Sequence, residues 1–157
     1  MISAQNSHFL RLTFKYCSLI FLFAACNKPT LQQQMLSVFK EKGVKINENT
    51  EGVFILDDEG CLTCNRAFGT IISKLLDNQK VNFIVTADAN KVDISDYLEK
   101  SYQPNILIDR KKTIFKNEFF NHSTILFMSK LQIDTIIIIN VNDLEQQMDL
   151  VKNKFNL

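Results

Sequence analysis

The chain has 157 residues, of which 46% are hydrophobic and 22% are charged, and its formal net charge is +1. This length and apolar content suit one globular domain with a buried core. The near-neutral charge and the lack of a basic cluster argue against nucleic-acid binding. Four glycines and no phosphate-cradling loop argue against a bound nucleotide or flavin, and no pattern indicates haem.

The first 25 residues differ from the rest of the chain. Arg11 and Lys15 precede an apolar run from Tyr16 to Ala25, and no acidic residue occurs in this segment. The run is shorter than the roughly 20 residues of a membrane-spanning helix, and it matches the roughly 7–15 residues of a signal peptide's apolar core. We therefore expect residues 1–25 to be a signal peptide rather than part of the fold.

The sequence Leu-Phe-Ala-Ala-Cys at positions 22–26 resembles a bacterial lipobox. The resemblance implies that Cys26 becomes the lipid-modified first residue of the mature protein. A polar tether over residues 26–34 and a domain over residues 35–157 would follow. The alternatives are an ordinary signal peptide cleaved after Ala25 and an uncleaved anchor. Since buried lipid methylenes hold a protein to a bilayer, we expect a membrane-anchored lipoprotein that faces the periplasm or the cell exterior.

Processing would change both the charge and the cysteine content. Without the two basic residues of the signal peptide, 16 basic side chains stand against 17 acidic ones, which gives a net charge near −1. Cys17 would leave with the signal peptide and Cys26 would carry lipid, so Cys61 and Cys64 would be the remaining thiols. Thiols outside the cytoplasm are commonly oxidised unless a partner reduces them. The pair is therefore either a resting disulfide or a centre that cycles.

Hydrophobic spacing predicts the first elements of the domain. Leu31, Met35, Val38 and Phe39 have helical spacing, and a glycine at position 43 is a typical helix stop. Further along the chain the pattern predicts, in order, a strand over Glu51–Leu56, a helix with one apolar face over Cys61–Leu76, and a buried strand over Val81–Thr86.

The second half of the chain continues the alternation. The pattern predicts a short helix over Asp93–Tyr102, a strand over Ile106–Ile108, a solvated charged turn over Asp109–Lys112, and a β-hairpin of Thr124–Met128 with Asp134–Ile139 that turns at Ser129-Lys130. A last helix is expected to begin at Asn142, whose side chain would cap it together with Glu145. Its buried stripe would consist of Leu144, Met148, Val151 and Phe155.

Strands alternating with helices, followed by an antiparallel pair and a closing helix, give an α/β sandwich on one mixed sheet. A strand that runs into Cys-Leu-Thr-Cys at the start of a helix resembles the thioredoxin-like superfamily. The anchored setting is similar to the TlpA/ResA type of membrane-tethered thiol-disulfide oxidoreductase. Over roughly residues 50 to 157, the resemblance implies a thioredoxin-like three-layer sandwich with an extra N-terminal helix.

Three features depart from the family pattern. Gly60 stands where members usually carry an aromatic residue, and the dipeptide between the cysteines lacks the common proline. A serine occupies the place of the cis-proline that packs against the family's disulfide. The resemblance implies substrate contacts at four positions in these regions: Leu62, Thr63, Ser123 and Thr124.

The position of the pair favours chemistry at Cys61. Backbone N–H groups at a helix start stabilise a thiolate, whereas Cys64 lies one turn further along and is expected to be less accessible. Cys61 would then attack a disulfide and Cys64 would resolve the mixed disulfide. The carboxylates of Asp57, Asp58 and Glu59 would disfavour a thiolate nearby, and we expect them to be solvated turn residues.

These observations leave three functions open. The first is thiol-disulfide exchange, with reduction favoured, on extracytoplasmic proteins and with an electron-donor protein as a second partner. The second is a copper or zinc site of Cys61, Cys64 and His122, similar to Sco-type copper chaperones on the same fold. The third is an inert disulfide in a non-catalytic binding module. No cofactor is required by the first or the third.

Overall fold

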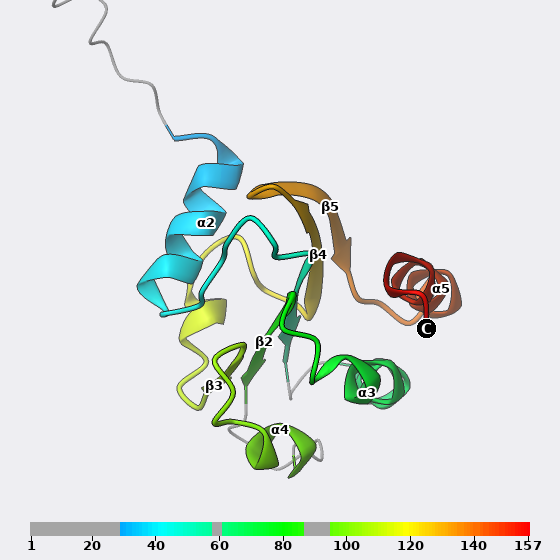
Figure 1. Ribbon diagram of the computed structural model, residues 1–157. Helices are drawn as coiled ribbons and strands as arrows, with labels where there is room; N and C mark the ends of the chain where they lie inside the picture. The colour runs from blue at the N-terminus through cyan, green and yellow to red at the C-terminus, as the bar shows by residue number, and fades with distance from the viewer. Residues whose placement is uncertain (1–28, 58–60, 87–94) are drawn as a thin grey trace, which may run out of the picture. The chain divides into compact units, whose positions relative to one another are not determined.

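The computed structural model describes residues 29–57, 61–86 and 95–157, and Leu31–Leu157 form one compact unit (Figure 1). The predicted signal peptide and the predicted lipidation site, Cys26, lie outside the described residues. None of the helices within those ranges combines the length and apolarity needed to cross a bilayer.

The elements follow the order predicted from the sequence. The helices are α2 (Leu31–Glu41), α3 (Leu62–Leu75), α4 (Ser95–Glu99) and α5 (Leu144–Phe155), with a 3-10 helix η1 (Thr113–Lys116). The strands are β1 (Gly52–Leu56), β2 (Val81–Thr86), β3 (Ile106–Asp109), β4 (Thr124–Ser129) and β5 (Gln132–Ile138). Helix α2 already includes residues 31–34, which the sequence analysis assigned to the tether.

The strands form one mixed sheet in the order β3-β2-β1-β4-β5. β1, β2 and β3 are parallel, with Phe54 opposite Phe83 and Phe83 opposite Ile106. β4 runs antiparallel to β1 and β5 antiparallel to β4. Parallel strands joined through helices, followed by a hairpin and a final helix, make this a thioredoxin-like α/β fold, which confirms the predicted fold class.

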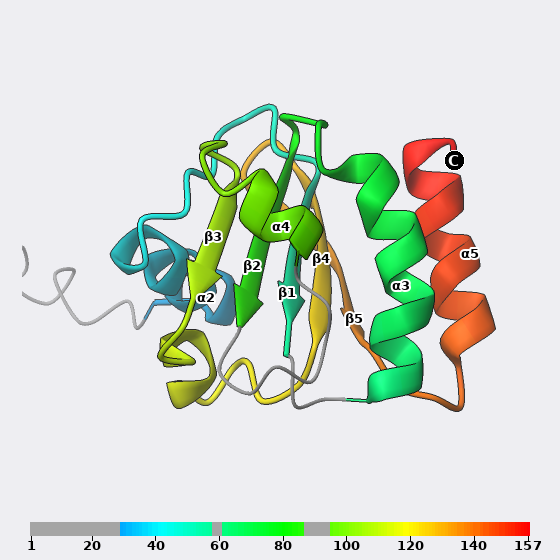
Figure 2. The ribbon, with the colours of Figure 1, turned by 90° about the horizontal axis from the view of Figure 1, so that it is seen from below.

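The sheet is covered on both faces because successive side chains of a strand point to opposite sides. Val53 and Ile55 pack into the core that is shared with α2 and η1. Phe54 and Leu56 pack into the core that is shared with α3 and α5. Figure 2 shows α3 and α5 side by side, and both begin at the end of the sheet where β1 finishes. The result is a three-layer sandwich, and one end of it carries the cysteine pair.

Two details of the helix boundaries differ from the sequence prediction. α5 begins at Leu144, and its N-cap residue, Asp143, makes no side-chain capping bond. Instead the Oδ1 of Asn140 accepts hydrogen bonds from the N–H groups of Asn142 and Asp143, at 3.0 and 3.1 Å. The predicted cap at Asn142 is therefore wrong, because an asparagine two residues earlier organises the turn.

The hairpin turn lies one residue later than predicted. Lys130 and Leu131 both have positive φ, at 48° and 66°, as the two-residue turns that match the twist of a hairpin require. The strands pair from Thr124 with Ile138 to Ser129 with Gln132, with an irregularity in the register between Phe127 and Met128. This turn marks the end of the sheet opposite the cysteine pair.

α5 packs closely on the start of β1. A Cβ atom at Gly52 would lie 2.9 Å from Cζ of Phe155 and 3.7 Å from the carbonyl oxygen of Leu126. The ring of Phe155 also lies 6.1 Å from that of Phe54 and 6.0 Å from that of Phe127, measured between centroids. Glycine at position 52 therefore allows the last turn of α5 to lie against the sheet.

We expect Gly52→Ala to lower the free energy of unfolding by about 1–3 kcal/mol, because the new methyl group displaces the ring of Phe155. In a Phe155→Leu background the added cost should be smaller, since the shorter side chain leaves room. Urea denaturation of the four proteins in this double-mutant cycle measures the coupling. Equal costs in both backgrounds would contradict this packing.

Candidate active site

Cys61 and Cys64 form a disulfide at the start of α3, with their Cα atoms 5.1 Å apart. Cys61 is exposed, whereas Cys64 is 1% exposed. The structure therefore confirms the expected difference in access between the two residues. One sulfur-bearing residue faces solvent and the other belongs to the core.

Cys61 acts as the N-cap of α3. Its backbone is extended, with φ −62° and ψ 106°, and its carbonyl oxygen accepts the first helical hydrogen bond from the N–H of Asn65 at 2.9 Å. Its Sγ accepts a hydrogen bond from the N–H of Cys64 at 3.2 Å. Oxygen atoms usually fill this capping role. Here the sulfur of Cys61 fills it, so the N–H of Cys64 points at the atom that would carry negative charge after reduction.

The buried side of α3 holds the pair in place. Cys64, Phe68, Ile72 and Leu75 share one apolar core with the sheet and with α5. The helical spacing of these residues places them on one face. Cys64 therefore has a fixed position beneath the exposed Cys61.

A polar cluster surrounds Asp57, the residue that follows β1. The side chain of Ser123, which precedes β4, accepts a hydrogen bond from the N–H of Asp57 at 2.9 Å. The Nδ2 of Asn65 donates to the carbonyl oxygen of Asp57 at 2.8 Å. The side-chain carboxylate of Asp57 also has two partners. The Nζ of Lys112 lies 3.6 Å from its Oδ1, and the hydroxyl of Thr86 donates a hydrogen bond to the same oxygen at 3.4 Å. Asp57 therefore connects β1, β2, α3, β4 and the segment after β3.

The carboxylate of Asp57 and the ammonium of Lys112 are largely shielded, with side chains that are 20% and 18% exposed. The sequence predicts a solvated turn residue at Asp57, and this prediction is wrong for that position. Asp58 and Glu59, which were assigned the same role, lie outside the described residues, as does Gly60.

The segment Asp109–Lys112 was expected to be a solvated turn, and the structure corrects this at both of its ends. Asp109 is 9% exposed, and its carboxylate accepts hydrogen bonds from the N–H of Ile114 at 2.7 Å and from the hydroxyl of Thr113. Lys112 turns inward from a left-handed conformation with φ 50°. Only Arg110 and Lys111, in the middle of the segment, are exposed as expected.

Ser123 stands where the family that the sequence resembles carries a proline, and its environment is internal. It is 6% exposed, and no cis peptide bond occurs among the residues that the structure describes. Its carbonyl oxygen accepts a hydrogen bond from the N–H of Ile139 at 2.9 Å, in addition to the bond that its hydroxyl makes with Asp57. Ser123 thus joins the ends of β1, β4 and β5 beside the cysteine pair.

The other predicted site residues are divided between the surface and the interior. Leu62 and Thr63 are exposed beside Cys61, where a substrate can reach them. Thr124 is 3% exposed, and its hydroxyl donates to the carbonyl oxygen of His122 at 2.8 Å. The assignment of substrate contacts to these residues and to Ser123 remains a prediction.

His122 is exposed, at the loop that leads into β4. Within residues 29–57, 61–86 and 95–157, no group of three or more His, Cys, Asp or Glu residues is placed to hold a metal ion. Cys61, Cys64 and His122 are therefore not assembled as a three-ligand site in this disulfide form.

Lys112, Thr86 and Asn65 are site residues that the sequence analysis missed. Asn65 directly follows Cys64 and is 9% exposed, so a polar residue sits at the edge of an otherwise apolar helix face. Thr86 ends a run of buried residues and is itself fully buried. Two signals were available in the sequence: a polar residue directly after the cysteine motif, and a polar residue at the end of a buried strand. Nothing local marks Lys112.

Comparison of the sequence with models of known protein families gives no match, and comparison with curated protein sequences gives none either. The geometry of the disulfide and of the cluster around Asp57 therefore carries the interpretation.

We expect Ser123→Ala to lower the free energy of unfolding by about 1–3 kcal/mol, because it removes a buried acceptor for the N–H of Asp57. Ser129→Ala, at the exposed far end of the same strand, should change stability by less than about 0.5 kcal/mol. Chemical denaturation of both variants measures the difference. Equal effects would show that the hydroxyl of Ser123 does not hold the end of β1.

Asp109 makes stability depend on pH. Burial raises the pKa of its carboxyl group, but hydrogen bonds from the N–H of Ile114 and from Thr113 outweigh burial and hold the pKa below its ordinary value of 3.8. A lowered folded-state pKa gives stability that is fully present above the unfolded-state pKa. That stability is lost as the pH falls through the folded-state pKa.

We therefore expect Asp109→Asn to cost about 1–3 kcal/mol near pH 7, and we expect this cost to shrink progressively as the pH falls from about 4 through the lower folded-state pKa. Asp134→Asn, on the exposed strand β5, is the matched control and should change stability little at either pH. Urea titrations across this pH range make the measurement. A cost for Asp109→Asn that does not vary with pH would contradict the role assigned to the carboxylate.

Proposed function

We propose that this chain exchanges electrons with disulfides or thiols of other extracytoplasmic proteins through the Cys61–Cys64 couple. The observation that carries the proposal is the disulfide at the start of α3, with an exposed Cys61 and a buried Cys64. An accessible sulfur at a helix N-terminus is the arrangement that thiol-disulfide exchange requires, because the thiolate is both stabilised and within reach of a partner.

Reduction of a substrate disulfide is the favoured direction. In the dithiol form, the thiolate of Cys61 attacks one sulfur of the substrate, the substrate S–S bond breaks, and the leaving thiolate takes up a proton. The thiol of Cys64 then loses its proton and attacks the sulfur of Cys61, which releases the second substrate thiol. The Cys61–Cys64 disulfide re-forms, and two electrons have passed to the substrate.

The geometry supports this order of events. The N–H of Cys64 already points at the Sγ of Cys61, so a thiolate there would gain a charge-assisted hydrogen bond. Cys64 is buried, which keeps it from external disulfides, yet it is close enough to Cys61 to be bonded to it. A second turnover requires an electron-donor protein with a dithiol that reduces the couple again.

The proposed location is the outer side of a membrane, with the chain held by lipid on Cys26. The basic residues and apolar run before Cys26 support export, and the small residues just before it support lipidation. Export would also place the couple where disulfides occur among its partner proteins. The proposed partners are therefore extracytoplasmic proteins.

We expect Cys61→Ser to abolish reduction of insulin disulfides by dithiothreitol-regenerated protein. We expect Cys64→Ser, mixed with a peptide disulfide in the absence of dithiothreitol, to accumulate a mixed disulfide and release one peptide thiol, because its attacking thiol remains and its resolving thiol is gone. The same substitution at two positions thus separates the two roles, and mass spectrometry detects the trapped adduct. Wild-type activity in Cys61→Ser, or trapping by Cys61→Ser instead of Cys64→Ser, would refute the assignment.

A further inference from the structure

We propose that the end of the domain opposite Cys61 rests on the surface of a bilayer that contains acidic lipids. This inference rests on the lipid anchoring at Cys26 that forms part of the proposed function. It adds which face of the domain meets the membrane, and in which direction the cysteine pair points.

The short connection to the anchor limits where the domain can lie. Cys26 precedes Leu31, the first residue of α2, by five positions. An extended chain covers at most about 3.6 Å per residue, so lipid on Cys26 holds the start of α2 within about 18 Å of its own attachment point. That distance is less than the diameter of a domain of this size. The part of the domain near Leu31 therefore stays at the bilayer.

The start of α2 contacts the turn between β4 and β5. The Nε2 of Gln32 donates a hydrogen bond to the carbonyl oxygen of Leu131 at 3.2 Å, which places the start of α2 against the turn between β4 and β5. That turn lies at one end of β4, and Ser123, which bonds the residue after β1, lies at the other end. Leu31 and Leu131 are 57% and 39% exposed, so this end offers apolar side chains to the headgroup region.

The same end carries lysines that suit an acidic surface. Lys80, Lys130 and Lys154 line one surface hollow of about 460 Å³. Glu48 and Glu51 also line it, and Glu51 pairs with Lys80 at 2.7 Å. Lysine side chains near a bilayer are attracted to its negative surface potential, and their apolar stems can lie along apolar surface while their ammonium groups stay in water.

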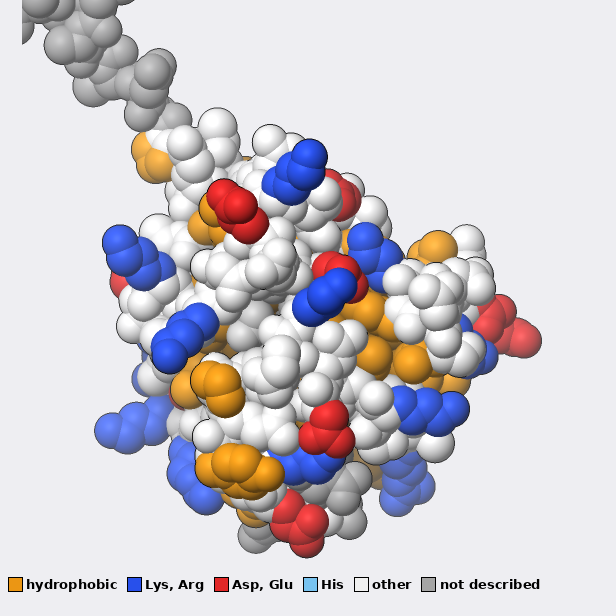
Figure 3. Space-filling model, viewed as in Figure 1, with side chains coloured by type: hydrophobic (Ala, Val, Ile, Leu, Met, Phe, Trp, Pro, Cys, Tyr) orange, Lys and Arg blue, Asp and Glu red, His pale blue; other side chains and the backbone are white. Residues whose placement is uncertain are grey.

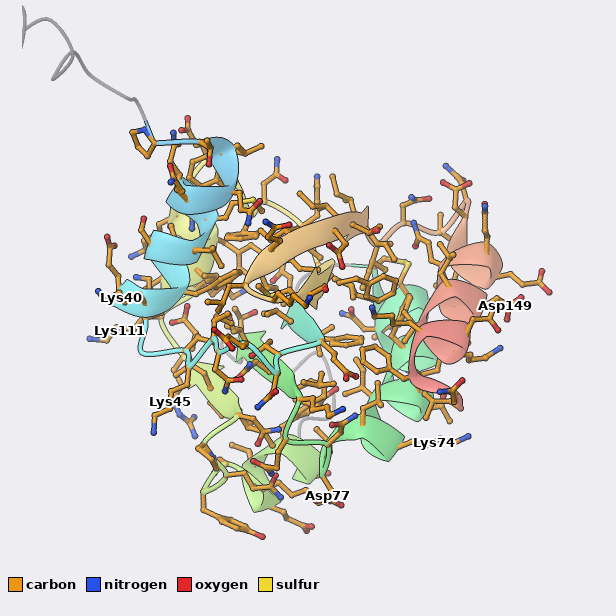
Figure 4. The ribbon with its side chains drawn as sticks, turned by 45° about the horizontal axis from the view of Figure 1, so that its top comes forward. Lys40, Lys45, Lys74, Asp77, Lys111 and Asp149 are labelled. Carbon is orange, nitrogen blue, oxygen red and sulfur yellow. A yellow bond between two sulfur atoms is a disulfide. The ribbon has the colours of Figure 1, made fainter. Side chains whose placement is uncertain are left out.

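Two further lysines belong to the loop before β1 and to the last turn of α3. The first is Lys45, whose carbonyl oxygen accepts a hydrogen bond from the side chain of Asn82, and the second is Lys74. Figure 4 shows the side chains of Lys45 and Lys74 pointing outward. Figure 3 views the molecule from this end, and Lys and Arg side chains are spread across it with fewer acidic ones between them. The lysines and the short connection to Cys26 therefore favour the same face of the domain at the bilayer.

This orientation defines the class of substrate. Cys61 would stand on the order of 30 Å from the bilayer, which is the length of a domain of this size. Substrate disulfides would belong to soluble proteins, or to domains that project a similar distance from the membrane. Disulfides at the level of the headgroups would lie out of reach.

The test uses the full lipidated protein in vesicles, with tryptophan as a depth reporter because the chain has no tryptophan of its own. Leu131→Trp reports on the proposed membrane end. Val141→Trp, which is 58% exposed and follows β5 near Ser123, reports on the Cys61 end. Fluorescence quenching by brominated phosphatidylcholine is measured with and without about one third of phosphatidylglycerol.

We expect acidic vesicles to give about twofold or stronger quenching of Leu131→Trp and little quenching of Val141→Trp. Adding Lys130→Glu/Lys154→Glu, or roughly 0.5 M NaCl, should reduce the quenching of Leu131→Trp. Arg110→Glu/Lys111→Glu makes the same change of charge at the Cys61 end, and it should leave the quenching of Leu131→Trp unchanged. Flotation with the vesicles, measured in parallel, reports on the anchor alone.

The outcomes separate the two proposals. A chain that does not float with vesicles overturns lipid anchoring, and the orientation with it, while thiol exchange at Cys61 is assayed independently. A chain that floats with both reporters equally quenched or equally unquenched overturns the orientation and leaves the anchor in place. Quenching of Leu131→Trp that is the same with and without phosphatidylglycerol overturns the role of the lysines.

Discussion

The hydrogen bonds at Asp57 are the constraint on which the candidate site depends. β1 ends there, and its last peptide groups are held from two directions, by Ser123 ahead of β4 and by Asn65 in the first turn of α3. The first bond closes the sheet beside the site, and the second fixes where α3 begins. The start of α3 determines where the N–H of Cys64 points, so the surroundings of both sulfurs depend on these two contacts.

Much of the fold follows from local patterns. The continuous apolar run of β1 and the helical spacing in α3 are properties of a few consecutive residues, and burial of these side chains then leaves few ways to stack the layers. The polar contacts were harder to predict. Ser123 is 66 residues from Asp57 in the sequence, and Lys112 reaches the same carboxylate from the segment after β3. Apolar periodicity carries no information about which polar residue meets which.

The same reasoning explains why Ser123 was hard to interpret. By analogy with the family that the sequence resembles, the position of Ser123 indicates a surface that holds substrate. A proline at this position has no N–H and no hydroxyl that could bond with its neighbours. A serine hydroxyl can instead bond to the chain around it, and that of Ser123 accepts a hydrogen bond from the N–H of Asp57. The loop is therefore held by hydrogen bonds where the family relies on the shape of a cis-proline.

The disulfide itself favours chemistry over stability as its role. A bridge between residues three apart closes a very short loop, so it restricts the unfolded chain little. Apolar packing of Cys64, Phe68 and Ile72 already holds the first turns of α3 on the sheet. A bond that adds little stability and leaves one of its cysteines exposed at a helix N-terminus is open to attack by thiols. In the proposed exchange, the burial of Cys64 would direct a partner thiol to Cys61, which would give the couple a defined order of reaction.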